Sequence, residues 1–306
     1  MERIHQWRAR RPQVGELVQW DTSEHDWLEG RGERLYLILM IDDASSRALA
    51  RFVRQDSTAE NLRTLQAYLK RWGRPAAVYT DKASLFRVNR GPKLEEQLQG
   101  EGPKTQIGRA LQELGIEWIA AHSPQAKGRV ERFFGTAQDR LVKGMRKAGV
   151  CTLAEAQRYL NRVYLPMWNR RFTVEPASDT DAHRALGPEH DLPSILSHVE
   201  TRRVGQDYTI QIGRTRYQIA RQSIVAGMRA APVRVEQRMD GKLAVRFRQQ
   251  YLAVSVCPDR SKLPSRPASD SKIKTRTGGR QHEWMQGFDL RSSPPIWRVL
   301  DQGYER

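Results

Sequence analysis

The chain has 306 residues, of which 39% are hydrophobic and 8% aromatic, enough to build a folded core. It carries 52 Lys and Arg against 35 Asp and Glu, a net charge of +17, which favours a polyanionic partner such as nucleic acid. Two cysteines, Cys151 and Cys257, exclude a disulfide framework and a CxxC zinc site. No apolar run is long enough to span a membrane, and the N-terminus lacks the apolar segment of a secretory signal. We therefore expect a cytoplasmic protein with no membrane partner.

Composition and periodicity divide the chain into four predicted segments. Residues 1–14 form a basic lead-in, and residues 15–187 hold regular helix and strand patterns. Residues 188–257 hold short alternating segments punctuated by glycine, typical of a small all-β, barrel-like domain. Residues 258–306 are rich in Ser, Pro, Lys and Arg without periodicity, which predicts a basic, disordered tail.

The second segment begins with three predicted strands at residues 17–22, 35–41 and 47–53. The middle strand is apolar throughout, which is typical of a central strand buried on both faces. Asp42 and Asp43, followed by Ala-Ser-Ser, have the side chains of a hairpin turn. The opening is therefore predicted to be an antiparallel meander.

Helices and strands alternate after the meander. Ser57 and Glu60 predict a helix start, and apolar residues at helical spacing continue to Trp72. Further elements are predicted as strands at 76–81 and 116–120 and as helices around 107–114, 128–145 and 153–168. The order βββαβαβαα predicts an α/β fold, a ribonuclease H-like mixed five-stranded sheet with flanking helices.

Three acidic residues occupy related places in this fold. Asp21 and Asp81 end the first and fourth strands, which lie side by side in such a sheet, and Glu131 stands near the start of the third helix. Three carboxylates that converge without cations repel one another, and a divalent metal removes that conflict. Oxygen ligands without His or Cys select Mg²⁺ or Mn²⁺, and two such ions serve phosphoryl transfer.

Each acid also has a simpler explanation. A strand-terminal Asp is common in loops, and a Glu at a helix start interacts favourably with the helix dipole without performing chemistry. Glu24 and Asp26, just past Asp21, compete for the first ligand position. The pair Asp42-Asp43 competes as well, although the hairpin turn explains it better.

Three sequence blocks carry a resemblance to a known family. Gln19-Trp-Asp21, Tyr79-Thr-Asp81-Lys and the block from His122 to Arg132, with Ser-Pro-Gln-Ala-Lys-Gly-Arg-Val-Glu, resemble the DDE integrase and transposase superfamily. Within it the chain most closely resembles bacterial insertion-sequence transposases of the ISNCY group. The resemblance implies that Asp21, Asp81 and Glu131 are the metal-binding catalytic triad. The stretch between Asp81 and Glu131 is longer than in retroviral integrases, which leaves the role of residues 90–104 open.

The resemblance also implies an activity and its partners. We expect a DDE-type polynucleotidyl transferase, a transposase or integrase that uses two Mg²⁺ or Mn²⁺ ions to cut and join DNA at the ends of its own mobile element. Its partners would be element ends, target DNA and further copies of the chain, at the bacterial nucleoid. Such transposases carry a helix-turn-helix ahead of the core, so one alternative is an inactive DNA-binding remnant that lacks it. A ribonuclease H-like or resolvase-like nuclease is a third hypothesis.

Basic residues surround the third acid of the triad. Lys127, Arg129 and Arg132 flank Glu131, and cations at a helix start oppose the helix dipole, so helix stability does not explain them. We expect these side chains to contact DNA phosphates, and Gly128 to let the DNA backbone approach closely.

Overall fold

The computed structural model of the chain describes residues 9–80, 105–120 and 128–257. The predicted basic tail and most of the predicted lead-in lie outside these residues. Within the described ranges, no helix has the length and apolar character needed to cross a membrane.

A mixed five-stranded sheet forms the centre of the first half, in the order β3-β2-β1-β4-β5. Its strands are β1 (Leu17–His25), β2 (Leu35–Asp42), β3 (Ala48–Val53), β4 (Ala77–Thr80) and β5 (Glu117–Ala120). β1 pairs antiparallel with β2 and parallel with β4, and β4 pairs parallel with β5. The predicted meander and the predicted adjacency of the first and fourth strands are therefore confirmed.

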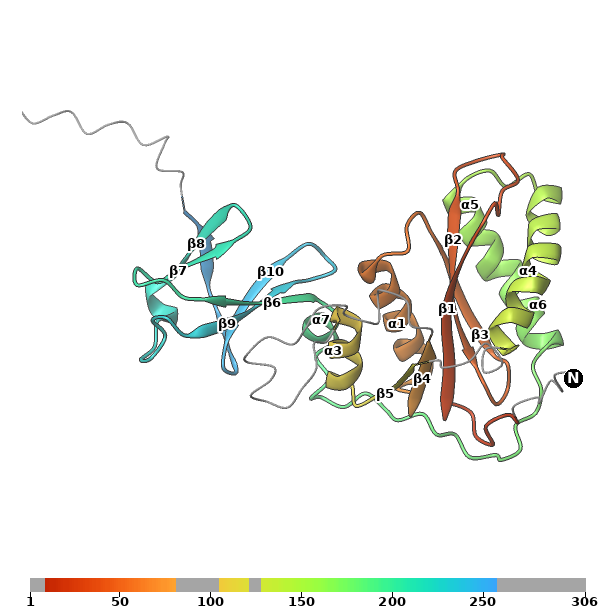
Figure 1. Cartoon of the computed structure of the whole chain (residues 1–306), viewed down its shortest axis with the longest axis horizontal. Coiled ribbons are helices and arrows are strands. Elements are labelled where there is room, and N and C mark those ends of the chain that lie inside the picture. The colour runs from red at the N-terminus through yellow and green to blue at the C-terminus, as the bar shows by residue number, and fades with distance from the viewer. Residues whose placement is uncertain (1–8, 81–104, 121–127, 258–306) are drawn as a thin grey trace, which may run out of the picture. The chain divides into compact units, whose positions relative to one another are not determined.

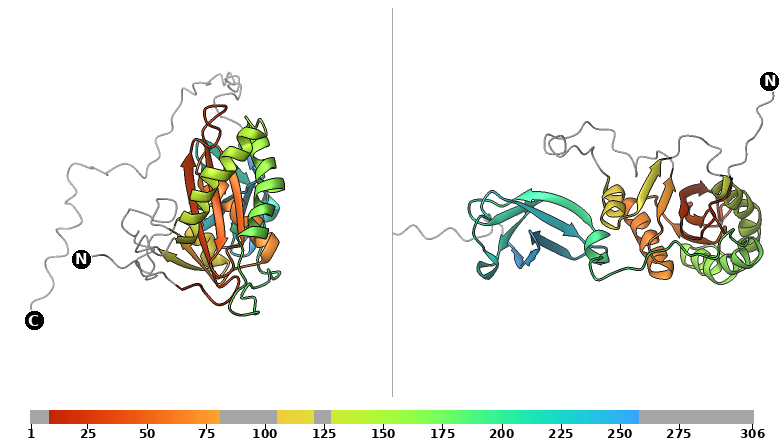
Figure 2. Two further views of the ribbon diagram at one scale, coloured as in Figure 1. Left: turned by 90° about the vertical axis from the view of Figure 1, so that its right-hand side faces the viewer. Right: turned by 90° about the horizontal axis from the view of Figure 1, so that it is seen from below.

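Helices cover both faces of this sheet (Figure 1). They are α1 (Thr58–Trp72), α3 (Gln106–Glu113), α4 (Gly128–Lys147), α5 (Leu153–Tyr159), η2 (Leu160–Tyr164) and α6 (Leu165–Arg171). Alternate side chains of β2 point to opposite faces, so Ile38 packs with α1 and α3, whereas Leu37 packs with α4 to α6. Figure 2 shows the green helices α4 to α6 lying across their face of the sheet. The predicted mixed sheet with flanking helices is confirmed.

The helix starts follow their sequence signals. The Ser57 side chain accepts a hydrogen bond from the Glu60 backbone N–H, as the capping pattern predicts, and α1 ends at Gly73. A reciprocal capping box, formed by Thr152 and Glu155, begins α5, whereas at α1 only the Ser57 half of the predicted box is present. Side-chain caps satisfy N–H groups that have no partner inside the helix, which sets where each helix begins.

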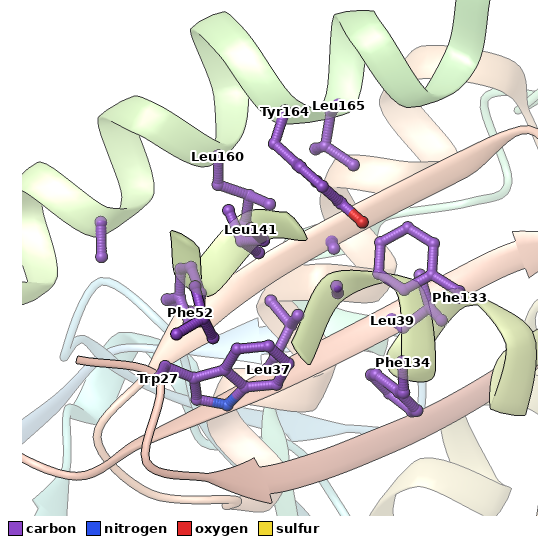
Figure 3. Packing of buried hydrophobic residues seen from close by; sticks show 14 of the residues in the cluster. Trp27, Leu37, Leu39, Phe52, Phe133, Phe134, Leu141, Leu160, Tyr164 and Leu165 are labelled. Carbon is purple, nitrogen blue, oxygen red and sulfur yellow. The ribbon is translucent and has the colours of Figure 1, made fainter. Parts of the chain in front are cut away.

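Several aromatic residues pack among aliphatic ones in the core between the sheet and α4 to α6 (Figure 3). The Phe133 ring lies 4.5 Å from Trp168 and 6.0 Å from Tyr164, both in edge-on contact. Trp168 also stacks on Phe172 at 4.6 Å, and its indole Nε1 donates to the Ser46 backbone oxygen at 3.1 Å. This packing ties α4 and α6 to the hairpin between β2 and β3.

The predicted single helix at 153–168 differs in detail, because the run α5-η2-α6 contains one π-helical turn, η2, and extends to Arg171. This run lies along the outer edge of β3. The Asn169 side chain accepts from the Ala48 backbone N–H at 2.8 Å and donates to the Ala48 oxygen at 3.0 Å. The Gln157 side chain accepts from the Phe52 N–H at 2.8 Å. These side-chain amides therefore form hydrogen bonds with backbone groups of β3 that face away from β2.

Two small sheets follow the core. The short helices of this part are α7 (Leu192–Ile195) and η3 (Arg221–Ser223). Its strands are β6 (His198–Arg203), β7 (Thr209–Ile212), β8 (Thr215–Ile219), β9 (Pro232–Gln237), β10 (Leu243–Phe247), β11 (Gln250–Leu252) and β12 (Val254–Val256). They form a four-stranded sheet, β11-β10-β9-β6, and a three-stranded sheet, β12-β8-β7, around a shared apolar cluster. β6, β11 and β12 were not expected from the sequence, and closure into a barrel stays a prediction.

Replacing Trp168 tests this packing. Trp168→Ala removes a side chain that is 2% exposed and leaves a cavity, so we expect a loss of about 3–5 kcal/mol in the free energy of unfolding. Urea denaturation followed by circular dichroism measures the loss. Val163→Ala, on the same helical run but 48% exposed, should stay within about 0.5 kcal/mol of the parent. A Trp168→Ala loss no larger than that of the control would contradict the assignment of Trp168 to the core.

Candidate active site

The first predicted acid, Asp21, lies inside β1 and not at its end, because pairing with β2 carries the strand on to His25. The prediction that Asp21 ends the strand was wrong: the residues after Asp21 are polar, so the apolar pattern stops before the strand does. The four preceding strand residues, from Leu17 to Trp20, are buried, whereas Asp21 is half-buried. Its Oδ1 accepts a hydrogen bond from the Thr22 backbone N–H at 3.0 Å. Asp21 and Gln19 lie on the same face of β1, since alternate residues of a strand share a face, and α4 packs on that side of the sheet. The strand therefore holds the Asp21 carboxylate at the boundary between core and solvent.

The second predicted acid, Asp81, lies outside the described residues. It directly follows Thr80, the last residue of β4. Thr80 is buried, and its hydroxyl accepts a hydrogen bond from the Trp118 indole Nε1 at 2.9 Å, which anchors the end of β4 to β5. The parallel register with β1 ends at the pair Gln19 and Tyr79. The assignment of Asp81 stays a prediction.

The third predicted acid, Glu131, lies in the first turn of α4 and is exposed. The helix forms there because Val130, Phe133, Phe134 and Ala137 supply one apolar face that packs on the sheet. Glu131 lies next to this apolar face on the helix, and its side chain remains exposed. The N-terminal end of a helix carries a partial positive charge, which favours an ionised carboxylate at this position.

Gln19 connects the elements that carry the first and third acids, a role that the sequence did not reveal. Its side-chain Oε1 accepts from the Val130 backbone N–H at 3.3 Å, and its Nε2 donates to Asp43 Oδ1 at 2.8 Å. Gln19 is 1% exposed in a strand of apolar neighbours. A buried polar side chain requires a hydrogen-bonding partner, and this is the signal by which sequence reasoning could have found it.

The basic residues of the third block have different surroundings. Arg132 is exposed, and Lys127 lies outside the described residues. Arg129 is largely buried: its side chain is 12% exposed, and its Nε lies 3.8 Å from Asp43 Oδ1. At Gly128, a Cβ atom would have no described atom within 4 Å, so the helix start is open on that side. Contacts of these residues with DNA phosphate stay predictions.

The competing acids have structural roles. Asp42 is buried, and its Oδ1 accepts from the Gly15 N–H at 2.8 Å. Its Oδ2 accepts from the Ser45 N–H at 2.7 Å and the Ser45 hydroxyl at 2.6 Å, which confirms the predicted hairpin turn. Glu24 pairs with Arg34 at 3.5 Å, and Asp26 accepts from the Gly30 N–H at 3.1 Å.

The side chains predicted as metal ligands carry the oxygen atoms that a hard divalent cation prefers. Asp21 and Glu131 offer carboxylate oxygens, the ligands that Mg²⁺ and Mn²⁺ prefer. Among residues 9–80, 105–120 and 128–257, no three Asp, Glu, His or Cys side chains gather closely enough to hold a metal ion. The third predicted ligand, Asp81, falls outside these ranges.

Comparison with known proteins gives relatives of one kind. The chain is 41% identical over 255 residues to a Sinorhizobium fredii protein described as a candidate transposase, y4bF, covering 83% of this chain and 54% of the relative. It is 34% identical over 174 residues to the transposase for insertion sequence IS1202 of Streptococcus pneumoniae, covering 56% of this chain and 36% of that protein. The chain thus spans about half the length of the first relative. The predicted resemblance to insertion-sequence transposases is confirmed, and no protein-family model matches the chain.

Two of the solved structures that overlap partly with the chain are a viral integrase core domain and a viral intasome. The HTLV-2 integrase catalytic core domain in complex with magnesium gives a TM-score of 0.36 at 16% identity, covering 50% of this chain and 91% of the other. The simian T-cell lymphotropic virus intasome gives a TM-score of 0.39 at 15% identity, with 82% of each chain covered. The fold described above rests on the strand order and register of the chain itself and not on these similarities.

If Asp42 stabilises the hairpin turn, replacing it should lower the free energy of unfolding equally with and without metal. Asp42→Ala leaves the buried Gly15 and Ser45 N–H groups without acceptors, each at a cost of about 1–3 kcal/mol. The loss in the free energy of unfolding, measured in urea, should be the same with EDTA and with Mg²⁺. Asp26→Ala, at an exposed turn, is the matched control and should cost far less. A loss for Asp42→Ala that appears only with Mg²⁺ would assign Asp42 to a metal site.

Proposed function

We propose that the chain, a homologue of insertion-sequence transposases, is a DDE-type polynucleotidyl transferase that performs metal-dependent DNA cleavage and strand transfer at mobile-element ends. The observation that carries the proposal is the hydrogen bond between the Val130 N–H and Gln19, because it joins the strand of Asp21 to the helix start of Glu131. Asp81 is proposed as the third member on its sequence position after β4. The similarity to proteins named as transposases supports the same activity.

Asp21, Asp81 and Glu131 would hold Mg²⁺ or Mn²⁺, as a pair of ions in the arrangement that two-metal phosphoryl transfer uses. When bound, such cations neutralise negative charge that develops on phosphate oxygens during phosphoryl transfer. The residues of the chain would orient these cations, and the rigid strand β1 and helix α4 would hold Asp21 and Glu131 in place. Water would attack one phosphodiester at an element end, and the released 3′ hydroxyl would then attack target DNA.

The remaining parts of the chain would serve binding. The exposed Arg132, with Lys127, would contact phosphates close to the carboxylates, and Gly128 would leave room for the DNA backbone. We further propose that the two small sheets form a barrel-like module for DNA or subunit contacts. The protein would act as a homo-oligomer on DNA in the bacterial cytoplasm.

The triad is tested by charge-removing substitutions. Asp81→Asn and Glu131→Gln should abolish nicking and strand transfer by the full chain in Mg²⁺ or Mn²⁺, because each removes an anionic oxygen ligand. Their unfolding free energy in EDTA should stay within about 1 kcal/mol of the parent, because less repulsion between like charges offsets the helix-dipole interaction that Glu131→Gln loses. Asp139→Asn is the control: it removes an exposed carboxylate from the same helix and should retain activity. Full activity of Glu131→Gln would refute the assignment.

Phosphate contact is tested by a salt titration of duplex binding. The logarithm of the affinity of the parent should fall linearly with the logarithm of the salt concentration, and Arg132→Ala should make that slope shallower by roughly one unit. Lys143→Ala, an exposed cation farther along α4 that pairs with Asp139, should leave the slope unchanged. Equal slopes for the parent and Arg132→Ala would exclude a phosphate contact by Arg132. Comparing an element-end duplex with a random duplex measures specificity in the same experiment.

A further inference from the structure

The bridge formed by Gln19 requires a side chain that carries both a hydrogen-bond donor and an acceptor. A backbone N–H, that of Val130, always donates, so Gln19 must offer it an oxygen. The Asp43 carboxylate accepts, so Gln19 must offer it an N–H. A carboxamide has both groups on one planar unit, whereas a carboxylate lacks the donor and an aliphatic side chain lacks both. The two partners therefore determine the orientation of the Gln19 amide.

Asp43 provides a rigid anchor for this bridge. It is fully buried, its Oδ2 accepts from the Arg11 backbone N–H at 2.9 Å, and its own N–H donates to the Leu17 oxygen at 2.9 Å. The largely buried Arg129 lies beside Oδ1, and it comes from the same helix turn as Val130. Asp43 thus holds the first turn of α4 by two routes, through Gln19 and through Arg129.

The bridge lies next to both proposed ligands along the chain. Gln19 precedes Asp21 by two residues on one face of β1, and the N–H that it binds belongs to the residue before Glu131. Val130 is in the first turn of α4, where N–H groups lack partners within the helix. A shift of the helix start relative to β1 would therefore break this hydrogen bond and move Glu131 relative to Asp21.

We propose that Gln19 is a positioning residue that sets the separation of Asp21 and Glu131, with Asp43 as its anchor and Arg129 as a second support. The inference rests on the proposed function, because it assigns these two carboxylates to one metal site. Gln19 touches neither DNA nor metal in this role and acts through the backbone of α4. A misplacement of about 1 Å at a catalytic group costs on the order of 10²-fold in rate, so a bridge of this kind has a large effect on activity.

Exchanging the carboxamide and the carboxylate between the two positions provides the test. In Gln19→Glu, a second carboxylate faces Asp43. In Asp43→Asn, one amide oxygen remains for two donors, the Gln19 Nε2–H and the Arg11 backbone N–H, so one of them loses its acceptor. In the double variant, the new amide at position 43 donates to the new carboxylate at position 19, whose other oxygen accepts from the Val130 N–H. The double variant therefore restores both hydrogen bonds with the net charge of the parent.

The measurements are the Mn²⁺ dissociation constant by electron paramagnetic resonance and the rate of DNA cleavage, both per folded protein. We expect Gln19→Glu to weaken Mn²⁺ binding at least about ten-fold and to lower the rate on the order of 10²-fold, and Asp43→Asn, which can keep the bridge, to have a smaller effect. The double variant should recover most of both. Gln19→Met, of similar size and uncharged, removes both hydrogen bonds and should behave like Gln19→Glu. It keeps the test decisive if the charged variants unfold.

Parent-like Mn²⁺ affinity and rate in folded Gln19→Met would overturn the proposal, because a purely structural Gln19 would affect stability alone. Failure of the double variant to recover, while it folds as the parent does, would also overturn it. Glu131→Gln, measured in parallel, separates this inference from the function on which it rests. If Glu131→Gln keeps full activity, the proposed function fails. If it is inactive and the exchange has no effect, only the role of Gln19 fails.

Discussion

The arrangement of the core depends on β1, the middle strand of the five-stranded sheet. It pairs antiparallel with β2 along most of its length and parallel with β4 from Leu17 to Gln19, and its side chains enter cores on both faces. Trp20, 1% exposed, packs toward α1, and its indole donates to Asn61 at 3.1 Å. Gln19 points to the opposite face and meets α4. A single strand thus connects two helical layers and two directions of strand pairing, and its register determines which residues leave the core.

Periodicity was sufficient to predict this architecture. The uninterrupted apolar run of β2 could only be buried on both faces, and the stripe ending at Trp72 required an amphipathic helix. The strands that were missed are short or polar. β6 has the sequence HVETRR, and β11 has three residues, so neither carries an alternating apolar signal. The π-helical turn η2 left no recognisable mark either, because it changes hydrogen bonding without changing the apolar pattern.

The sequence could predict those features of the candidate site that depend on residues close together in the chain. Asp21 and Glu131 were predicted as ligands from an expected strand end and a helix start; the helix start is confirmed, Asp21 lies inside β1, and their metal-binding role stays a prediction. The turn at Asp42 was predicted correctly from its Asp and Ser residues. The partnership of Arg129 with Asp43 could not be found in this way. A cation at a helix start is equally consistent with a phosphate and with a buried carboxylate from a distant hairpin, and only the fold brings that carboxylate beside it. Tertiary contacts of this kind need the chain path, which periodicity does not supply.

The side-chain amides along β3 have a consequence for aggregation. An edge strand with free backbone groups is a template on which another chain can add a strand. Asn169 occupies both backbone groups of Ala48, and Gln157 occupies the N–H of Phe52, so an incoming strand would have to displace covalently attached competitors. The helical run that carries them is anchored in the core by Trp168. Self-association of this basic protein through backbone pairing at Ala48 and Phe52 of β3 is therefore disfavoured.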